Sequence, residues 1–304
     1  MHYFKLKQGN ADVYEITEEL YEEKTELKKP YHVPGKDGKI RNFAICPVCD
    51  NPIQLVGLFK ASERKPYGKH YNQDTELAKH CEQQYRYCPY AKHTYQAPDD
   101  ILKEKTTDYE IGVYNTLREH YDCVIYLAEQ VSGLHFSLQL AEEYLKSFLG
   151  SCAHRFSLSS YYNLPWVLLH AQYAKPCYHK LVRKDSPLYQ LLEKQKEVSL
   201  LPYKDSSYYI IEKTGKWMEL EYSFIHHKRT AVNEDLCESI QLVLSKTGKD
   251  GLPKIVGRAT LSINEYRFPN LLHSEKVKSM RNTMRNQELR AMANRMMPEL
   301  EKGG

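Results

Sequence analysis

The sequence predicts an α+β protein whose chain divides into three parts. Residues 99–204 carry apolar side chains at helical spacing, as in Ile111, Tyr114, Leu117 and Tyr121, and indicate a helical region. From about residue 205, apolar and polar side chains alternate instead, which is typical of an antiparallel sheet. Residues 1–98 show neither pattern at length and hold four of the eight cysteines. We therefore expect boundaries near residues 98 and 204.

Helix signals in the middle part are clear enough to place individual elements. The apolar stripe that starts at Asp108 stops at Gly133, so one helix is expected there. A second helix is expected over about Ser137–Leu149, with Gly150 as its stop. Further helical segments are expected at about 164–174 and 188–197.

In the last part, residues 208–213 and 216–225 are expected to pair as a hairpin across a Thr-Gly turn. Two more strands are expected at 238–245 and 254–263. A terminal helix from about Ser274 to Met297 has a methionine side and a basic face that includes Arg281 and Arg285. We expect it to pack onto the sheet, the alternatives being a protein partner or a phosphate backbone.

Composition bounds the class of protein. The chain has 304 residues, with 43 Lys and Arg against 39 Asp and Glu. Its net charge of +4 is much lower than that of proteins that bind nucleic acid through a strongly basic tail. Tyrosine is abundant, at 25 against 8 Phe and 2 Trp, and suits base stacking as well as packing. The first residues lack the apolar stretch that is typical of a signal peptide, and the sequence has no run of about 18 apolar residues that could span a bilayer. We expect a cytoplasmic protein with no membrane contact, whose cysteines are thiols or metal ligands.

Cysteine spacing in the first part predicts a metal site. Cys46-Pro-Val-Cys49 is a C-x-x-C pair, in which the turn aims both thiolates at one point, and a second pair from later in the chain completes a tetrahedron around zinc. We predict Zn²⁺ held by Cys46, Cys49, His70 and Cys88. His80 or Cys81 could replace either of the last two, and Cys88 with His93 would give the late pair of a treble clef.

Two other interpretations of these cysteines remain. They could be a reduced, partly buried set without metal, or a redox C-x-x-C, which should sit between a strand and a helix of a βαβ unit. The loop-rich context favours zinc. Short apolar strands before and after the knuckle predict the hairpin with which a zinc ribbon or treble clef begins, so the first part is expected to be a zinc-ribbon or treble-clef-like module.

Residues 43–70 also resemble a known family. Phe43-Ala-Ile-Cys-Pro-Val-Cys49, an apolar strand and then Pro66-Tyr-Gly-Lys-His70 are similar to the zinc-binding N-terminal region of CoiA-like competence proteins. The resemblance implies Cys46, Cys49 and His70 as ligands. Such proteins often join this region to a nuclease-like domain in DNA-handling systems, and that domain has no recognisable counterpart here.

Cations and tyrosine rings are interleaved around the predicted zinc site, a mixture that suits phosphate contacts and base stacking. The alternative is that the cations only solvate a small module and the tyrosines form its core. As candidate nucleic-acid contacts we take residues of this module together with two arginines of the terminal helix: Lys60, Arg64, Lys65, Lys69, Tyr71, Arg86, Arg281 and Arg285.

Evidence for catalysis is sparse. His226, His227 and Asn233 resemble part of an HNH nuclease core, in which a histidine activates water beside a metal ion. The two E-x-K triplets at Glu22 and Glu26 lack a recognisable upstream acid, and phosphate-binding loops, dinucleotide fingerprints and zinc-protease motifs are missing from the sequence.

A second metal site is conceivable from two Cys-x-His pairs, although this spacing is not a familiar knuckle. The pairs are Cys152 with His154 and Cys177 with His179.

The sequence therefore predicts a zinc-stabilised nucleic-acid-binding protein and favours a non-catalytic role. We expect it to be a subunit of a bacterial DNA- or RNA-processing system or of a mobile-element, antiviral defence system, in which the terminal helix could bind a protein partner. The alternatives are a metal-dependent nuclease and a protein-interaction adaptor with a purely structural zinc.

Overall fold

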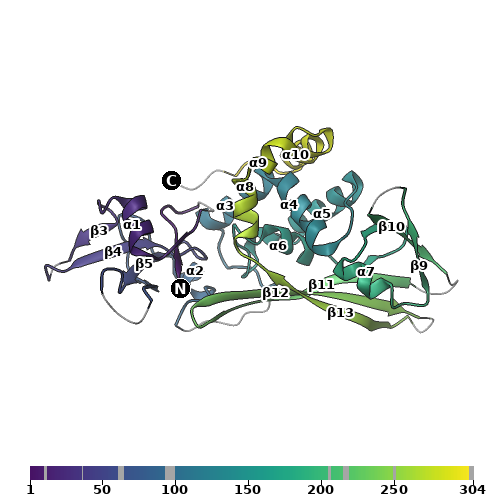
Figure 1. Cartoon of the computed structure of the whole chain (residues 1–304), viewed down its shortest axis with the longest axis horizontal. Helices are drawn as coiled ribbons and strands as arrows, with labels where there is room; N and C mark the ends of the chain where they lie inside the picture. Colours follow the sequence, from purple (N-terminus) through teal and green to yellow (C-terminus); the bar gives the residue numbers. More distant parts are fainter. Residues whose placement is uncertain are drawn as a thin grey trace.

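The computed structural model describes residues 1–9, 12–35, 37–60, 65–92, 100–204, 207–214, 219–248 and 251–300. Helices and antiparallel sheets are both present, so the predicted α+β class is confirmed. The molecule is elongated (Figure 1): the N-terminal module lies at one end, the helices form the middle, and a long sheet runs beneath them toward the opposite end.

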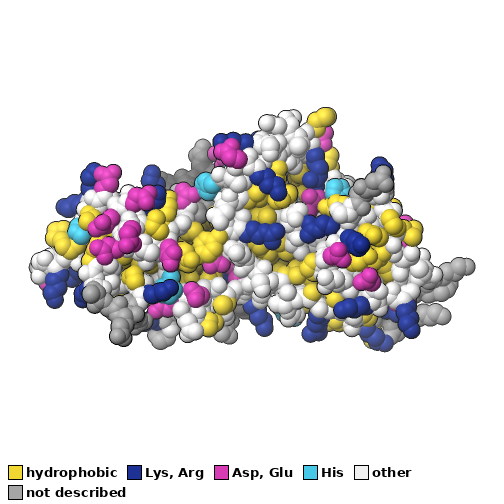
Figure 2. Space-filling view, in the orientation of Figure 1, with side chains coloured by type: hydrophobic (Ala, Val, Ile, Leu, Met, Phe, Trp, Pro, Cys, Tyr) yellow, Lys and Arg dark blue, Asp and Glu magenta, His cyan; other side chains and the backbone are white. Residues whose placement is uncertain are grey.

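The N-terminal module is built on a four-stranded antiparallel sheet in the order β3-β4-β5-β6, with a separate two-stranded pair and two short helices. Its elements are β1 (Tyr3–Phe4), β2 (Tyr14–Glu15), α1 (Glu18–Thr25), β3 (His32–Pro34), β4 (Ile40–Ile45), β5 (Pro52–Val56), β6 (Tyr67–His70) and α2 (Glu82–Arg86). The strands on either side of the C-x-x-C turn pair as predicted. Thr17 caps α1, whose acidic side chains gather on one face of the module in Figure 2.

The helical middle differs from the prediction at its first helix. The expected single helix from Asp108 to Gly133 is two helices, because the chain leaves helical geometry at His120, where φ is −118°. The expected helix after Ser137 is confirmed, and the Ser137 side chain caps it by accepting a hydrogen bond from the backbone N–H of Leu140. The helices are α3 (Asp108–Glu119), α4 (Tyr121–Ser132), α5 (Leu138–Gly150), the 3₁₀ turn η1 (Ala153–Arg155), α6 (Leu164–His170) and α7 (Pro187–Leu192).

The first strands after α6 lie inside the region predicted to be helical. The strands also form two separate sheets, where one sheet was expected. One sheet has the order β8-β10-β9 and the other β13-β12-β11-β7. The predicted pairing of 208–213 with 216–225 is therefore wrong: β10 pairs with β8 and β9, whereas β11 pairs with β12 and β7. The strands are β7 (Lys175–Pro176), β8 (Leu181–Arg183), β9 (Val198–Pro202), β10 (Tyr208–Lys213), β11 (Glu219–Val232), β12 (Asp235–Thr247) and β13 (Pro253–Ile263).

The predicted terminal helix is broken in two and packs elsewhere. After α8 (Arg267–Leu272), the chain forms α9 (Glu275–Arg281) and α10 (Met284–Met296), with Thr283 capping the second. The expectation that it packs onto the sheet is wrong, because α10 contacts α3, α4 and α5. Arg281 of α9 and Arg285 of α10 form ion pairs with two carboxylates of α4. These pairs hold both C-terminal helices against the helical block.

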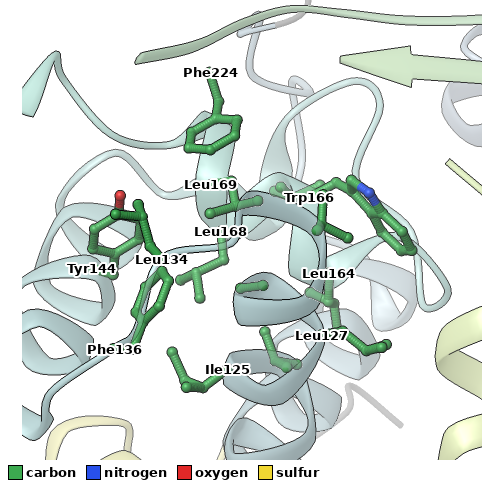
Figure 3. Close-up of a cluster of buried hydrophobic side chains, with 14 of the residues drawn as sticks. Ile125, Leu127, Leu134, Phe136, Tyr144, Leu164, Trp166, Leu168, Leu169 and Phe224 are labelled. Carbon is green, nitrogen blue, oxygen red and sulfur yellow. The ribbon is translucent and has the colours of Figure 1, made fainter. Parts of the chain in front are cut away.

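The main core lies between the helices and the long sheet (Figure 3). The short helix α6 is buried along its length, with Trp166 fully enclosed. It packs between Ile125 of α4 and Phe224 of β11. A second, smaller core lies inside the N-terminal module and includes Phe4, Tyr21 and the module's three buried cysteines, but it also contains Tyr162 from the helical part. The module therefore shares its core with the rest of the chain.

Close packing at Gly112 in α3 gives a first prediction. A Cβ at this position would lie 1.9 Å from the hydroxyl oxygen of Tyr161, whereas a Cβ at Gly150 would meet nothing within 4 Å. We expect Gly112→Ala to destabilise the protein by about 1–3 kcal/mol through overpacking. Gly150→Ala, the matched control, should be neutral or stabilise by about 0.5 kcal/mol through helix propensity. Urea unfolding would measure both, and equal stabilities would contradict the packing of α3 on Tyr161.

Candidate metal centre

Four side chains of the N-terminal module converge on one point. The ligand atoms of Cys46, Cys49, His70 and Cys88 all lie within 4.8 Å of one another, an arrangement that could hold a metal ion. The Sγ atoms of Cys46 and Cys88 are 3.9 Å apart, and Cys49 Sγ lies 3.2 Å from His70 Nε2. A tetrahedral zinc site with Zn–S bonds of about 2.3 Å has sulfur atoms about 3.8 Å apart. The donor set and spacing therefore fit zinc.

Three segments of chain deliver these ligands. Cys46 and Cys49 occupy the turn between β4 and β5, which is closed by a hydrogen bond of 2.8 Å from the Cys46 N–H to the Asn51 carbonyl. His70 is the last residue of β6 and lies opposite Ile53 in the sheet, so pairing with β5 brings it back to the turn. Cys88 follows α2 by two residues. Strand pairing and one short helix thus bring together residues that are 42 positions apart.

The centre is closed from solvent. Cys46 and Cys88 are fully buried, Cys49 is 3% exposed, and His70 is partly buried. Burial opposes ionisation of the Cys46 thiol, but hydrogen bonds with Cys49 and Cys88 and the charge of His70 hold its pKa well below its ordinary value. Burial lowers the pKa of His70, yet the charges of Cys49 and Cys46 raise it to about 11. Burial and the neighbouring thiols raise the pKa of Cys49 and Cys88, so the metal-free cluster favours a single thiolate, at Cys46, the form of cysteine that binds metal.

Asn51 supports the cluster from outside. It is 1% exposed, and its side-chain amide donates to Cys49 Sγ at 3.3 Å and to the Cys81 carbonyl at 3.2 Å. Its Oδ1 accepts from the Cys81 N–H at 2.6 Å. One side chain therefore orients a ligand sulfur and fixes the chain that leads to α2 and Cys88, which is the role of the outer groups in metal sites.

Asp50 anchors the N-terminal strand to the knuckle. It has a φ of 58° and is 5% exposed. Its carboxylate forms an ion pair with the buried Lys5 and accepts from the Gly9 N–H at 2.7 Å. Lys5 is also joined to Ile45 by two backbone hydrogen bonds of 2.9 and 3.0 Å. A buried charge of this kind is tolerated because it is paired.

The centre is also tied to the helical part of the chain. Tyr109 of α3 donates a hydrogen bond of 2.6 Å to the carbonyl of Val48, inside the C-x-x-C turn. Arg229 of β11 donates to the Tyr87 carbonyl, next to Cys88, at 3.2 Å.

A buried network makes a further tie through α2. Lys103 Nζ lies 3.1 Å from Gln84 Oε1 and 2.9 Å from Glu110 Oε1. Lys103 is 2% exposed and Glu110 is fully buried, so each charge depends on the other. Since Gln84 belongs to α2, this network holds the helix that precedes Cys88 against the start of α3.

The alternative ligands lie apart from the cluster. His80 is directed to Glu82, at 3.3 Å, and Cys81 uses its backbone to bind Asn51. His93 lies outside the described residues. In the described part of the chain, the Cys46 cluster is the one group of three or more Cys, His, Asp or Glu side chains that converges in this way, so the two Cys-x-His pairs of the helical part do not form such a group.

The candidate nuclease residues are not brought together. His226 and His227 occupy a β-bulge in β11; His226 is exposed, whereas His227 is buried 2.5 Å from the Glu238 carboxylate. Asn233 lies in the exposed turn between β11 and β12. Asn233 follows His227 by six positions along extended chain, a distance of about 20 Å at 3.3 Å per residue.

The candidate nucleic-acid contacts fall into different environments. Lys60, Lys65 and Lys69 are exposed on the N-terminal module, and Arg64 lies outside the described residues. The Tyr71 ring packs edge-on against Phe43. Arg86 is ion-paired with Glu104 at 3.1 Å.

The two arginines of the terminal helices contact other helices. Arg281 Nε lies 3.6 Å from the buried carboxylate of Asp122, and Arg285 binds Glu129 at 2.6 Å and the Phe136 carbonyl at 2.7 Å. Both side chains thus join the C-terminal helices to the helical block. Their assignment to nucleic acid stays a prediction.

Sequence reasoning missed the residues that support the ligands, above all Asp50 and Asn51. Both directly follow the C-x-x-C pair, and Asp-Asn at that place is a turn signal. Their partners Lys5 and Cys81 are 45 and 30 residues away, so no local pattern indicated these contacts.

Comparison with protein-family models, with curated proteins and with solved structures finds no match to this chain. The resemblance of residues 43–70 to CoiA-like proteins therefore stays a prediction. Among the described helices, none has the length and apolar character needed to span a membrane.

Replacing single cysteines tests the ligand set. We expect the purified protein to contain one zinc per chain and Cys88→Ser to lose it, because three remaining ligands bind zinc far more weakly. Cys81→Ser, a matched control seven residues earlier, should keep the metal. Metal analysis by mass spectrometry and thermal unfolding would measure both. Retention of zinc by Cys88→Ser with loss in Cys81→Ser would show that Cys81 is the ligand instead.

Asn51 tests the support of the centre. We expect Asn51→Ala to bind zinc about 10- to 100-fold more weakly, because Cys49 loses its hydrogen-bond donor and the Cys81 backbone loses its partner. Competition with a zinc chelator would give the affinity. Asn72, exposed on the same module, supplies the control substitution Asn72→Ala, which should leave the affinity unchanged. An unaltered affinity in Asn51→Ala would contradict the assigned role.

Proposed function

We propose that the cluster is a structural zinc centre and that the chain is a zinc-stabilised nucleic-acid-binding protein. The donor set supports the first half of this proposal. Four protein ligands, three of them cysteines, fill a tetrahedral shell, and burial keeps water from the ion. Catalytic zinc sites keep a position open for water or substrate. A zinc ion at this centre would therefore stabilise the fold and would not take part in a reaction.

The observation that carries the second half is the placement of three lysines. Lys60 and Lys65 line one pocket of the N-terminal module, and Lys69 lines another, beside His70. A third pocket shares Lys65 with the first and Tyr67 with the second. The three pockets thus adjoin along β6, and we call them together the β6 groove. Ammonium groups spaced along a groove are what a phosphate backbone requires.

A nucleic-acid site on this module does not need the C-terminal helices. Arg281 and Arg285 already have carboxylate partners on α4, and removing either to bind phosphate would take positive charge away from a buried acid. We therefore confine the proposed site to the N-terminal module, where the zinc would hold the turn and the strand that frame the groove.

A salt series tests this function. We expect zinc-loaded protein to bind DNA or RNA with an affinity that falls steeply with salt, because bound phosphates release counterions. The triple variant Lys60→Gln, Lys65→Gln, Lys69→Gln should bind more weakly, and the slope of log affinity against log salt should decrease in magnitude by about 2–3. Fluorescence anisotropy with labelled oligonucleotides would measure both quantities.

The matched control changes three exposed lysines outside the module, Lys194, Lys213 and Lys278, to glutamine. Its net charge equals that of the groove variant, so an equal loss of binding would show that only net charge matters. A zinc-loaded protein that binds no nucleic acid in moderate salt would contradict the proposal and favour the adaptor.

A further inference from the structure

The end of the β6 groove at His70 is a pocket with its own composition. It has a volume of ≈ 470 Å³, within the usual range for small-ligand sites. Its walls come from β6, from the loop after α2 and from the turn between β11 and β12. The lining residues that matter to the argument are Tyr67, Lys69, His70, Tyr85, Tyr90 and Lys92.

Three tyrosines give this pocket its aromatic character. Each is partly exposed, so the rings contribute to the wall and are not wholly enclosed in the core. Tyr85 lies edge-on to His70, with ring centroids 5.0 Å apart. Tyr90 packs against the small core of the module, which fixes its position. Partly exposed rings held by their surroundings are suited to stacking on bases.

Lysines at this pocket supply positive charge. Lys69 and Lys92 are both exposed, one in β6 and one after the Cys88 loop. Glu234, an acid in the lining, is ion-paired with the amino group of Met1 at 2.7 Å. The pocket therefore favours an anion.

The opposite end of the groove carries acidic side chains as well as lysines. The pocket that contains Lys60 and Lys65 is also lined by Glu15, Glu18, Glu19 and Asp235. Glu18 and Glu19 belong to α1, and Figure 2 shows acidic side chains over the part of the module where Figure 1 places this helix. These acids partly offset the charge of Lys60 and Lys65, so the groove is polarised and its excess of positive charge lies at the end beside His70.

From this arrangement we propose that the pocket beside His70 binds an unpaired nucleotide of single-stranded nucleic acid. The base stacks on the tyrosine rings, and the flanking phosphates contact Lys69 and Lys92. A base within a duplex is already stacked on its neighbours, so its faces are not accessible to the rings. This inference rests on the proposed function and names the class of nucleic acid and the place where it binds.

The pocket also depends on the metal centre. His70 forms part of the wall and is at the same time a candidate ligand, and Tyr85 rests against its ring. Removing zinc would free the His70 ring, so we expect the zinc-free protein to lose the preference for single strands even where it retains helical structure.

The test compares binding of a single-stranded oligonucleotide with binding of its duplex by the zinc-loaded, full-length chain. We expect tighter binding of the single strand. Lys69→Gln with Lys92→Gln should weaken it about tenfold or more and reduce the magnitude of the salt slope by about 1–2. Tyr67→Ala should weaken it about 5- to 100-fold through lost stacking, whereas Tyr67→Phe, which keeps the ring, should bind like the parent.

Control variants and outcomes separate this inference from the function on which it rests. Lys194→Gln with Lys213→Gln removes the same charge elsewhere and should leave binding near the parent value. If nucleic acid binds but the Lys69, Lys92 and Tyr67 variants behave like the parent, or if duplex binds more tightly, the inference is overturned while the proposed function stands. If the zinc-loaded protein binds neither strand form, both are overturned. Metal analysis of each variant shows whether the centre remains intact.

Discussion

Convergence of three thiols and an imidazole on one point is the constraint on which the N-terminal module depends. The module's own apolar core is small, and three of its members are the cysteines themselves. Small cores seldom supply enough stability alone, and a structural metal is a usual remedy. Without a cation, burying several thiolates beside one another would be unfavourable. A cation bound at the cluster would therefore hold the knuckle, the end of β6 and the loop after α2 to one another.

The same constraint extends into the helical part. Tyr109 binds a carbonyl inside the C-x-x-C turn, and Arg229 binds the carbonyl next to Cys88. Lys103 and Glu110 hold α2 through Gln84. These contacts are polar and wholly or partly buried, so each requires correct geometry at the candidate metal centre, because an unmatched buried donor or charge is costly. Correct folding of the N-terminal module and of the helical part are thus coupled through the residues that surround the candidate ligands.

Much of the candidate site could be predicted from the sequence because its signals are local. C-x-x-C spacing and flanking apolar runs indicate the hairpin and the first two ligands. The predictions failed where the sequence pattern indicates a strand or a helix but not the element against which it pairs or packs. Period two marks 208–213 as a strand, yet β10 pairs with β8 and β9, a choice made by packing. The N-cap at Thr283 divides the expected terminal helix in a way that the apolar stripe does not reveal. Contacts of Asp50, Asn51 and Arg229 join residues far apart and left no local pattern.

Arg229 binds a residue far earlier in the chain, which sets the order in which contacts form during synthesis. The candidate ligands span 42 positions and are synthesised early, so metal capture requires only a modest loop closure. The bond from Arg229 to the Tyr87 carbonyl spans 142 positions and becomes possible only after most of the chain has been translated. Synthesis therefore separates two events in time: a local one that assembles the centre, and a distant one that seals it. During that interval the Tyr87 carbonyl lacks Arg229 as its partner, and a bound metal could exchange before the structure closes over it.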